Sequence, residues 1–183
     1  MPASVSVITV RRATADDAES LAALGASTFY ETFVESCRPE DMRAYLSATF
    51  GVAQQWAELA DPRSIFFIAE AEGTAAAAAA VGYAKLFRGE TPACVMANAA
   101  VELARLYVER DWHGRGVGEA LMREMLDEAG RLGCQTIWLG VWEHNERAIA
   151  FYRKWQFEVV GEHIFQVGDD PQNDLLMERK LSE

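Results

Sequence analysis

Residues 106–118 read Leu-Tyr-Val-Glu-Arg-Asp-Trp-His-Gly-Arg-Gly-Val-Gly, an apolar run that leads into three closely spaced glycines. A helical pattern follows at once, so the stretch predicts a strand that turns sharply into a helix. Such a turn leaves several backbone N–H groups unpaired, and the helix dipole adds about half a positive charge. Glycine, which has no Cβ, lets an anion approach these donors. The stretch therefore predicts a phosphate-binding turn.

Two better-known phosphate loops do not fit these glycines. A P-loop requires Lys followed by Ser or Thr after its last glycine, and no such pair is present here. The dinucleotide-binding GxGxxG pattern fails because the third glycine, Gly118, falls one residue early. A second interpretation stays open at this point, in which the turn merely connects a strand to a helix.

Strand and helix patterns extend in both directions from this turn. Residues 64–71 form a strongly apolar run of strand length, and Gly116–Leu132 carries apolar side chains at helical spacing. We expect strands over Val5–Arg12, Ser64–Ala71, Val81–Phe87, Val101–Val108, Thr136–Trp142, Phe157–Val167 and Leu175–Leu181. We expect helices that begin at Thr14, Pro39 and Val52, and helices over Gly116–Leu132 and Asn145–Trp155. This order predicts an α/β fold with a mixed sheet of about seven strands, flanked by about four or five helices.

Length and composition indicate one globular domain. The chain has 183 residues, half of them apolar and a quarter charged, and no repeat or linker divides it, so we expect 1–183 to be a single domain. The alanine run at 75–80 is expected to form an elongated hairpin turn or to start the next strand. With 28 acidic and 17 basic residues the net charge is −11, which disfavours nucleic acid and anionic membranes and favours a cationic partner.

Cysteine and histidine usage indicates a cytoplasmic protein without a metal centre. Cys37, Cys94 and Cys134 are scattered with no CxxC pair, and the histidines have no metal-binding spacing. The N-terminal residues lack a signal-peptide pattern, and no apolar run approaches the ~20 residues that cross a bilayer. We expect a monomer or homodimer in the cytoplasm.

A second motif lies 27 residues beyond Gly118 and reads Asn-Glu-Arg-Ala-Ile-Ala-Phe-Tyr at 145–152. Together with the turn at 113–118, it resembles the GCN5-related N-acetyltransferase (GNAT) family. That family has a first motif Gln/Arg-x-x-Gly-x-Gly/Ala and a second motif Asn-x-x-Ala-x-x-Phe-Tyr. The resemblance is close over 101–181, and the expected order of elements fits the family from Ile8 onward.

The resemblance implies the acyl-CoA N-acyltransferase fold and acetyl-CoA as the acetyl donor. It implies that the backbone of Leu106–Val108 pairs with the pantetheine arm and that the N–H groups of Gly114–Gly118 hold the pyrophosphate. Asn145 would hydrogen-bond the pantetheine, and Tyr152 would lie beside the thioester sulfur. The residues so assigned to acetyl-CoA are Leu106, Tyr107, Val108, His113, Gly114, Arg115, Gly116, Val117, Gly118, Asn145 and Tyr152.

Two positions depart from the family pattern. His113 replaces Gln or Arg, which weakens a side-chain contact to phosphate, and Gln156 replaces the glycine that usually precedes the following phenylalanine. A closer likeness, to the PaiA-type spermidine/spermine N-acetyltransferases, rests on 28–33, 138–146 and 168–174. It implies a polyamine such as spermidine or spermine as the acceptor.

Acetyl transfer to an amine requires a proton acceptor, a donor for the oxyanion and an acid for the leaving thiolate. Tyr152, a phenol on the helix, is the candidate acid, and a backbone N–H near Val108 is the candidate oxyanion donor. Glu102 is the candidate base because it aligns with the glutamate base of histone-type relatives; a solvated carboxylate is the alternative. With a period of two it shares a strand face with Leu106 and Val108, unless a bulge changes the parity.

Glu31 and Glu143 are the candidate carboxylates for binding the substrate, and an ordinary helix-surface acid is the alternative for Glu31. Together with the resemblance, these residues predict an amine N-acetyltransferase with a small-molecule acceptor, which we expect to be a polyamine. A second hypothesis changes the acceptor to a protein N-terminus, a lysine side chain or an aminoglycoside. A third is a non-catalytic acyl-CoA-binding regulatory module.

Overall fold

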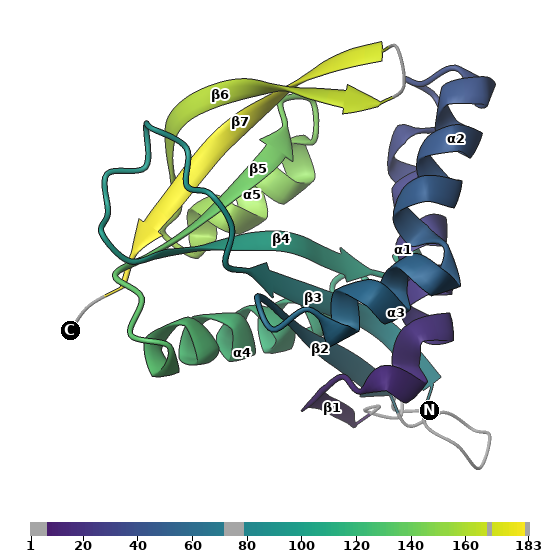
Figure 1. Cartoon of the computed structure of the whole chain (residues 1–183), viewed down its shortest axis with the longest axis horizontal. Helices are drawn as coiled ribbons and strands as arrows, with labels where there is room; N and C mark the ends of the chain where they lie inside the picture. The colour runs from purple at the N-terminus through teal and green to yellow at the C-terminus, as the bar shows by residue number, and fades with distance from the viewer. Residues whose placement is uncertain (1–6, 72–78, 168–169, 182–183) are drawn as a thin grey trace, which may run out of the picture.

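The computed structural model describes residues 7–71, 79–167 and 170–181, which form a mixed sheet with the strand order β1-β2-β3-β4-β5-β7-β6 (Figure 1). The strands are β1 (Ile8–Arg12), β2 (Ser64–Ala71), β3 (Ala79–Phe87), β4 (Ala100–Val108), β5 (Thr136–Trp142), β6 (Glu158–Val167) and β7 (Asp170–Lys180). The helices are α1 (Ala18–Phe33), α2 (Pro39–Phe50), α3 (Val52–Ala60), α4 (Val117–Arg131) and α5 (Glu146–Lys154), with single 3-10 turns at Ala15–Asp17 and Arg110–Trp112. The expected order of elements and the mixed α/β class are confirmed.

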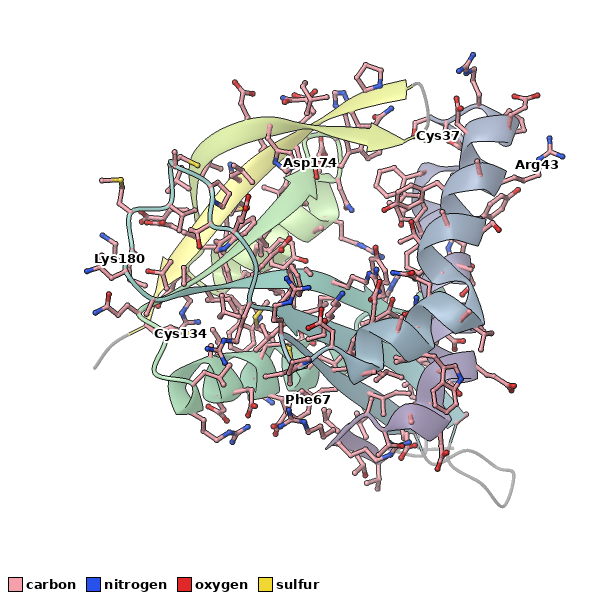
Figure 2. All side chains as sticks on the ribbon, viewed as in Figure 1. Cys37, Arg43, Phe67, Cys134, Asp174 and Lys180 are labelled. Atoms are coloured by element: carbon pink, nitrogen blue, oxygen red, sulfur yellow. The ribbon has the colours of Figure 1, made fainter. Side chains whose placement is uncertain are left out.

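Helices cover both faces of the sheet, with α4 and α5 on one face and α1, α2 and α3 on the other (Figure 1). β2 is buried on both faces, which explains its continuous apolar run. Ile65 and Phe67 pack in the cluster that includes α4, where Figure 2 labels Phe67. Phe66 and Ile68 pack with α1 on the opposite face. None of the described helices is long and apolar enough to cross a membrane.

β4 and β5 form the only parallel pair among the described strands, and they separate soon after they meet. Their pairing covers only Ala100–Glu102 against Thr136–Trp138. Beyond these residues β5 continues along β7, whereas β4 continues along β3 (Figure 1). The sheet is therefore split into two halves that diverge from Glu102 and Trp138.

A bulge in β4 overturns the expected parity of Glu102. Lys85 of β3 pairs with Arg105 and the next residue, Leu86, pairs with Leu103, which leaves Ala104 as an extra residue. Val101, Leu103, Leu106 and Val108 all pack toward α4. Glu102 consequently lies on the opposite face, together with Arg105 and Tyr107, and not with Leu106 and Val108 as a strict period of two predicts.

The last strand begins five residues before the expected Leu175. β7 starts at Asp170 because its antiparallel pairing with β6 continues to Val167. β5 reaches only as far as Asp174 along β7, so Pro171 faces no β5 ladder and its missing N–H is tolerated there. Residues 170–174 are polar or proline, so their hydropathy pattern does not predict a strand. The alanines up to Ala78, the expected strand residues Val5 and Ser6, and 168–169 lie outside the described residues.

The turn after α5 keeps its shape although Gln156 replaces glycine. Gln156 has a left-handed φ of 64°. The N–H of Gln156 donates to Arg153 at 3.0 Å and the N–H of Phe157 donates to Tyr152 at 3.1 Å. These two bonds form a Schellman motif, in which the left-handed position favours glycine.

Gln156→Gly is therefore expected to raise the free energy of unfolding by up to about 1 kcal/mol, because a Cβ in this conformation costs about 1–2 kcal/mol and glycine loses part of the gain to chain entropy. Thermal and urea unfolding measure the change. Gln156→Ala is the matched control, since it shortens the side chain and keeps the Cβ. An equal gain in both variants would show that the backbone conformation is not the cause.

Candidate active site

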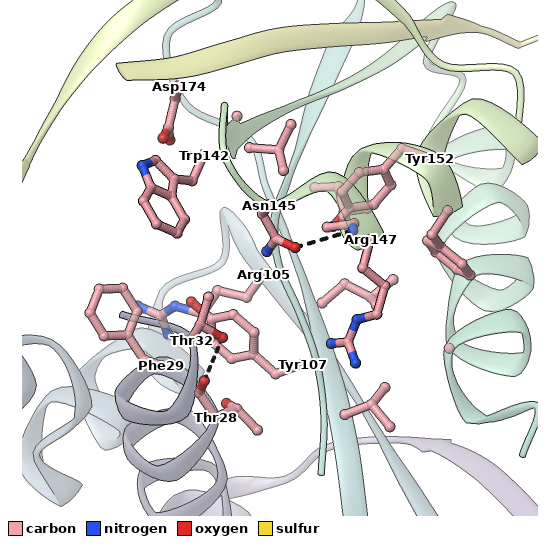
Figure 3. Close-up of a pocket in the computed structure, with 18 of the residues that line it drawn as sticks. Thr28, Phe29, Thr32, Arg105, Tyr107, Trp142, Asn145, Arg147, Tyr152 and Asp174 are labelled. Carbon is pink, nitrogen blue, oxygen red and sulfur yellow. Dashed lines mark hydrogen bonds between the residues drawn. The ribbon is translucent and has the colours of Figure 1, made fainter. Parts of the chain in front are cut away.

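A cavity of about 1140 Å³ opens where β4 and β5 separate. Figure 3 shows side chains from α1, β4, β5, α5 and β7 converging on it. Small-molecule sites typically measure about 300–1,000 Å³. The cavity is therefore large enough for two reactants to meet inside it.

The outer half of β4 presents a free backbone edge to this cavity. The N–H of Glu109 donates to the carbonyl oxygen of Val81 on β3 at 2.9 Å. Backbone groups alternate in direction along a strand, so Leu106 and Val108 direct their N–H and C=O groups away from β3. On that side, within the described part of the chain, β4 pairs with β5 only as far as Glu102. The edge can therefore pair with an extended ligand as it would with another strand.

The glycine turn lies between β4 and α4. Gly114 and Gly116 have left-handed φ values of 73° and 87°, and a Cβ built on either would meet no atom within 4 Å. The first helical hydrogen bond runs from the N–H of Ala120 to Gly116 at 3.0 Å, so the N–H groups of 116–119 precede the helical ladder. Open space in front of these donors is what an anion requires.

His113 binds the end of the β4 edge instead of pointing into the glycine turn. Its ring Nε2 lies 2.8 Å from the carbonyl oxygen of Val108, and Arg147 at the start of α5 donates to ring Nδ1. These contacts fit a neutral ring whose Nε2 carries the proton. Burial, with a smaller effect of the Arg147 charge, lowers the His113 pKa. The guanidinium of Arg147 thereby reaches the cavity wall. It lies next to His113, the position at which the family pattern has Gln or Arg.

Asn145 and Tyr152 bring α5 to the cavity. Asn145 is the N-cap of the helix, and its Oδ1 accepts the N–H of Ala148 at 3.2 Å (Figure 3). Its side-chain NH₂ group remains available as a donor. Tyr152 lies between Phe151 and Phe157, with ring centroids 5.6 and 5.7 Å away. Burial raises the pKa of Tyr152 to about 12, so the phenol keeps its proton at neutral pH.

Glu102 lies at the point where β4 and β5 diverge, half-buried in the cavity wall. Burial raises its pKa, and the charges of Lys85 and Arg105 oppose this rise without cancelling it. Both cations are bound to Glu58 on α3. Its Oε2 lies 2.8 Å from Lys85 and 2.7 Å from the Arg105 guanidinium, which also donates to Oε1 at 3.0 Å. Glu102 makes no hydrogen bond or ion pair with the described residues, so its carboxylate is free to accept a proton.

Most of the predicted site residues line this one cavity. They are Glu31, Glu102, Leu106, Tyr107, Val108, His113, Gly114, Gly118, Asn145 and Tyr152. Four others do not line it. The Val117 side chain is buried in the core, Gly116 caps α4, and the Arg115 guanidinium lies 5.1 Å from the centroid of the Trp112 ring. Glu143 is exposed and accepts a hydrogen bond from Asn173 at 3.2 Å.

Sequence reasoning assigned no binding role to several residues of the cavity wall. Asp174 on β7 is a half-buried carboxylate, and four rings form a continuous surface that we call the aromatic wall: Phe29 and Phe33 of α1, Tyr45 of α2 and Trp142 of β5. Phe29 and Phe33 have the spacing of a helix core face, and spacing does not distinguish a core from a cavity wall. The described residues contain no group of three His, Cys, Asp or Glu side chains placed to bind a metal.

A model of the acetyltransferase (GNAT) family matches residues 27–157. An uncharacterized N-acetyltransferase of Mycobacterium tuberculosis is 35% identical over 165 residues, which cover 90% of this chain and 98% of that protein. A spermine/spermidine N(1)-acetyltransferase of Bacillus subtilis is 29% identical over 69 residues, 37% of this chain and 45% of that protein. Among solved structures, PaiA N-acetyltransferase of Thermoplasma acidophilum in complex with coenzyme A has a TM-score of 0.70 and 18% identity, and the match covers 95% of this chain and 99% of that chain.

The family match includes the glycine turn, the free strand edge and the asparagine–tyrosine helix, which the fold brings to a single cavity. The likeness to the solved structure extends over nearly the whole chain and shows a common fold. The M. tuberculosis relative is similar over almost its full length. The chain belongs to the acetyltransferase (GNAT) family, as its two motifs predict.

Proposed function

We propose that the protein transfers the acetyl group of acetyl-CoA to a primary amine, and that this amine is a polyamine such as spermidine or spermine. The observation that carries the proposal is the cavity between β4 and β5. Its walls include a free strand edge and part of the glycine turn, and also carboxylates and aromatic rings. The two kinds of wall suit an anionic, extended donor and a cationic acceptor.

Three features of the chain fit acetyl-CoA. The Leu106 N–H and C=O groups can pair with an amide-containing arm, and the N–H groups of 116–119 can bind a pyrophosphate. Asn145 retains an NH₂ donor after capping its helix. The bound donor supplies an activated acetyl thioester. The residues around it then have to remove a proton from the amine, stabilise negative charge on the acetyl oxygen and donate a proton to the leaving sulfur.

The acceptor needs a base because a primary alkylamine has a pKa near ~10.4, so only about one molecule in a thousand is neutral at pH 7. Glu102, at the point where the strands diverge, accepts this proton directly or through a water molecule. The Val108 N–H on the free edge stabilises negative charge on the acetyl oxygen. Tyr152, which keeps its proton, donates to the leaving sulfur.

Charge supports a polyamine as the acceptor. The net charge is −11, and the cavity wall carries five carboxylates and five cationic side chains: Glu31, Glu35, Glu102, Glu119 and Asp174, and Lys85, Arg105, Arg110, Arg147 and Lys154. Glu58 pairs with Lys85 and Arg105, whereas Glu102 and Asp174 make no ion pair with the described residues. The spermine/spermidine N(1)-acetyltransferase of B. subtilis shares a 69-residue segment with this chain. The unpaired carboxylates Glu102 and Asp174 attract a molecule that carries more than one ammonium group.

A thiol-release assay at fixed acetyl-CoA tests the proposal against the other acceptors. We expect kcat/KM for spermidine or spermine to exceed that for an aminoglycoside or a short peptide with a free N-terminus by at least about tenfold. A preference for the peptide or the aminoglycoside would overturn the polyamine assignment and retain the acetyltransferase.

Gly116→Ala is expected to raise the KM for acetyl-CoA by about tenfold, because a methyl group enters the anion-binding turn and the left-handed φ of 87° is strained by about 1–2 kcal/mol. Gly133→Ala is the matched control. Gly133 lies beyond the other end of α4, with a φ of 70° and open space around its Cβ position. Both variants should lose similar stability, and only Gly116→Ala should weaken acetyl-CoA binding. An equal KM in both variants would contradict the assignment of this turn.

We further propose that residues 1–183 act as one domain in the cytoplasm. One sheet incorporates strands from β1 through β7, which supports a single domain. Cys37, Cys94 and Cys134 are free thiols, which fits a reducing compartment.

A further inference from the structure

Asp174 is an unpaired carboxylate inside the cavity. It lies on β7, opposite Trp142 of β5 and His163 of β6, and it is half-buried. It makes no hydrogen bond or ion pair with any residue that the structure describes. Burial alone raises its pKa to about 6. A carboxylate that is buried without a partner is costly to keep charged, and a cationic ligand would remove that cost.

The aromatic wall stands next to this carboxylate. Figure 3 shows Asp174 beside the Trp142 indole. The Trp142 ring lies 5.2 Å from Phe33, and Phe29 lies 4.4 Å from Phe33 and 4.5 Å from Tyr45, centroid to centroid. Aromatic faces attract ammonium groups, most strongly where water is excluded. A carboxylate beside an indole ring is therefore a candidate site for an alkylammonium ion.

Gly140 keeps the carboxylate accessible. It lies on β5, also in the cavity wall, and a Cβ built on it would be 3.3 Å from Asp174 Oδ2 and 3.4 Å from His163 Cε1. The contact with Asp174 is tighter than ordinary van der Waals contact, and the contact with His163 is at its lower limit. A methyl group at this position would therefore crowd Oδ2, which glycine does not.

Asp174 and Tyr152 lie at separate ends of the site. In Figure 3 the Asp174 carboxylate is beside Trp142, and Tyr152 lies well away from it on α5. When one amine of the acceptor reacts next to Tyr152, another part of the same acceptor molecule can therefore lie at Asp174. A monoamine would place only hydrocarbon there, while a di- or polyamine would place a second ammonium group.

We propose that Asp174, together with the Trp142 ring, binds an ammonium group of the acceptor other than the one that is acetylated, and so selects diamines and polyamines over monoamines. This inference rests on the proposed acetyl transfer to an amine. It adds a specificity residue that lies on β7, outside both sequence motifs of the family.

Two acceptors of equal length, hexamethylenediamine and hexylamine, test the proposal. We expect the wild-type protein to prefer the diamine by at least about tenfold in kcat/KM, as one charge-assisted contact allows. Asp174→Asn should bring this ratio close to one by raising the KM for the diamine much more than the KM for hexylamine. Asp127→Asn, the same substitution at an exposed position of α4, should keep the wild-type ratio.

Gly140→Ala is a second variant that keeps the charge and crowds the carboxylate. It should reduce the diamine preference in the same direction, and thermal unfolding checks that both variants are folded. The proposal is overturned by an unchanged ratio in Asp174→Asn, by an equal loss for both amines, or by a wild-type protein with no preference.

The proposed acetyl transfer and the proposed ammonium site can be tested separately. If wild-type protein releases thiol with neither amine, the proposed acetyl transfer to these amines fails, and calorimetry with hexamethylenediamine and coenzyme A still tests Asp174. Binding of the diamine that is about tenfold weaker in Asp174→Asn than in wild type would support the ammonium site. Equal binding by the two proteins would overturn it.

Discussion

Tyr152→Phe is expected to lower kcat by about 100-fold, the lower end of the range for loss of a general acid. The variant removes a single oxygen and keeps the ring, which packs against Phe151 and Phe157. Stability should therefore change little. Acetyl-CoA binding should also persist, because the β4 edge and the glycine turn are untouched.

Burial of Tyr152 also determines the expected pH dependence. Its pKa is about 12, so no rate loss from deprotonation of this phenol is expected between pH 6 and 10. A thiol in water has a pKa of about 8.5, so the Tyr152 phenol is the weaker acid of the two. The phenol therefore acts as a hydrogen-bond donor to the sulfur throughout the neutral range.

Tyr30→Phe is the matched control for this variant, because Tyr30 on α1 is 48% exposed. It should retain the wild-type kcat. A Tyr152→Phe enzyme with unchanged kcat would remove Tyr152 from the chemistry and leave it a packing residue.

Glu102→Gln is expected to lower kcat/KM by about 100-fold at neutral pH, as for loss of a general base. The amide has nearly the same shape, so the bulge at Ala104 and the pairing with Trp138 should persist. The wild-type kcat/KM should rise with pH through the Glu102 pKa, which burial holds above its usual value. In Glu102→Gln this rise should disappear.

Glu102→Gln is expected to leave the neighbouring ion pairs of Lys85 and Arg105 intact. Both cations are bound to Glu58, so loss of the Glu102 charge leaves their ion pairs in place. Glu158→Gln, at an exposed position of β6, is the control for removal of one acidic charge. A Glu102→Gln enzyme with wild-type rate and pH profile would assign the base to another carboxylate of the cavity.

Local patterns were enough to predict the order of elements. The apolar run of β2, the helical spacing in α4 and the glycine turn between β4 and α4 each reflect a preference within one segment. The resemblance to the family then linked the turn at 113–118 to the motif at 145–152. The structure brings both to one cavity.

What the sequence did not reveal depends on contacts between segments. The bulge at Ala104 is a property of the β3–β4 pairing, and nothing in 100–108 marks it. Asp174 belongs to a polar stretch that reads as a loop, and it reaches the cavity because β7 pairs with β5. The contact of Arg147 with His113 similarly joins two segments that spacing alone does not relate.

Acceptor-dependent release of thiol from acetyl-CoA by the purified protein, with mass spectrometry of the amine product, shows whether the protein is an amine acetyltransferase. We expect one acetylated spermidine or spermine for each thiol released, and no release without the amine. Binding of acetyl-CoA without thiol release for any amine would contradict the account and identify a non-catalytic acyl-CoA-binding module.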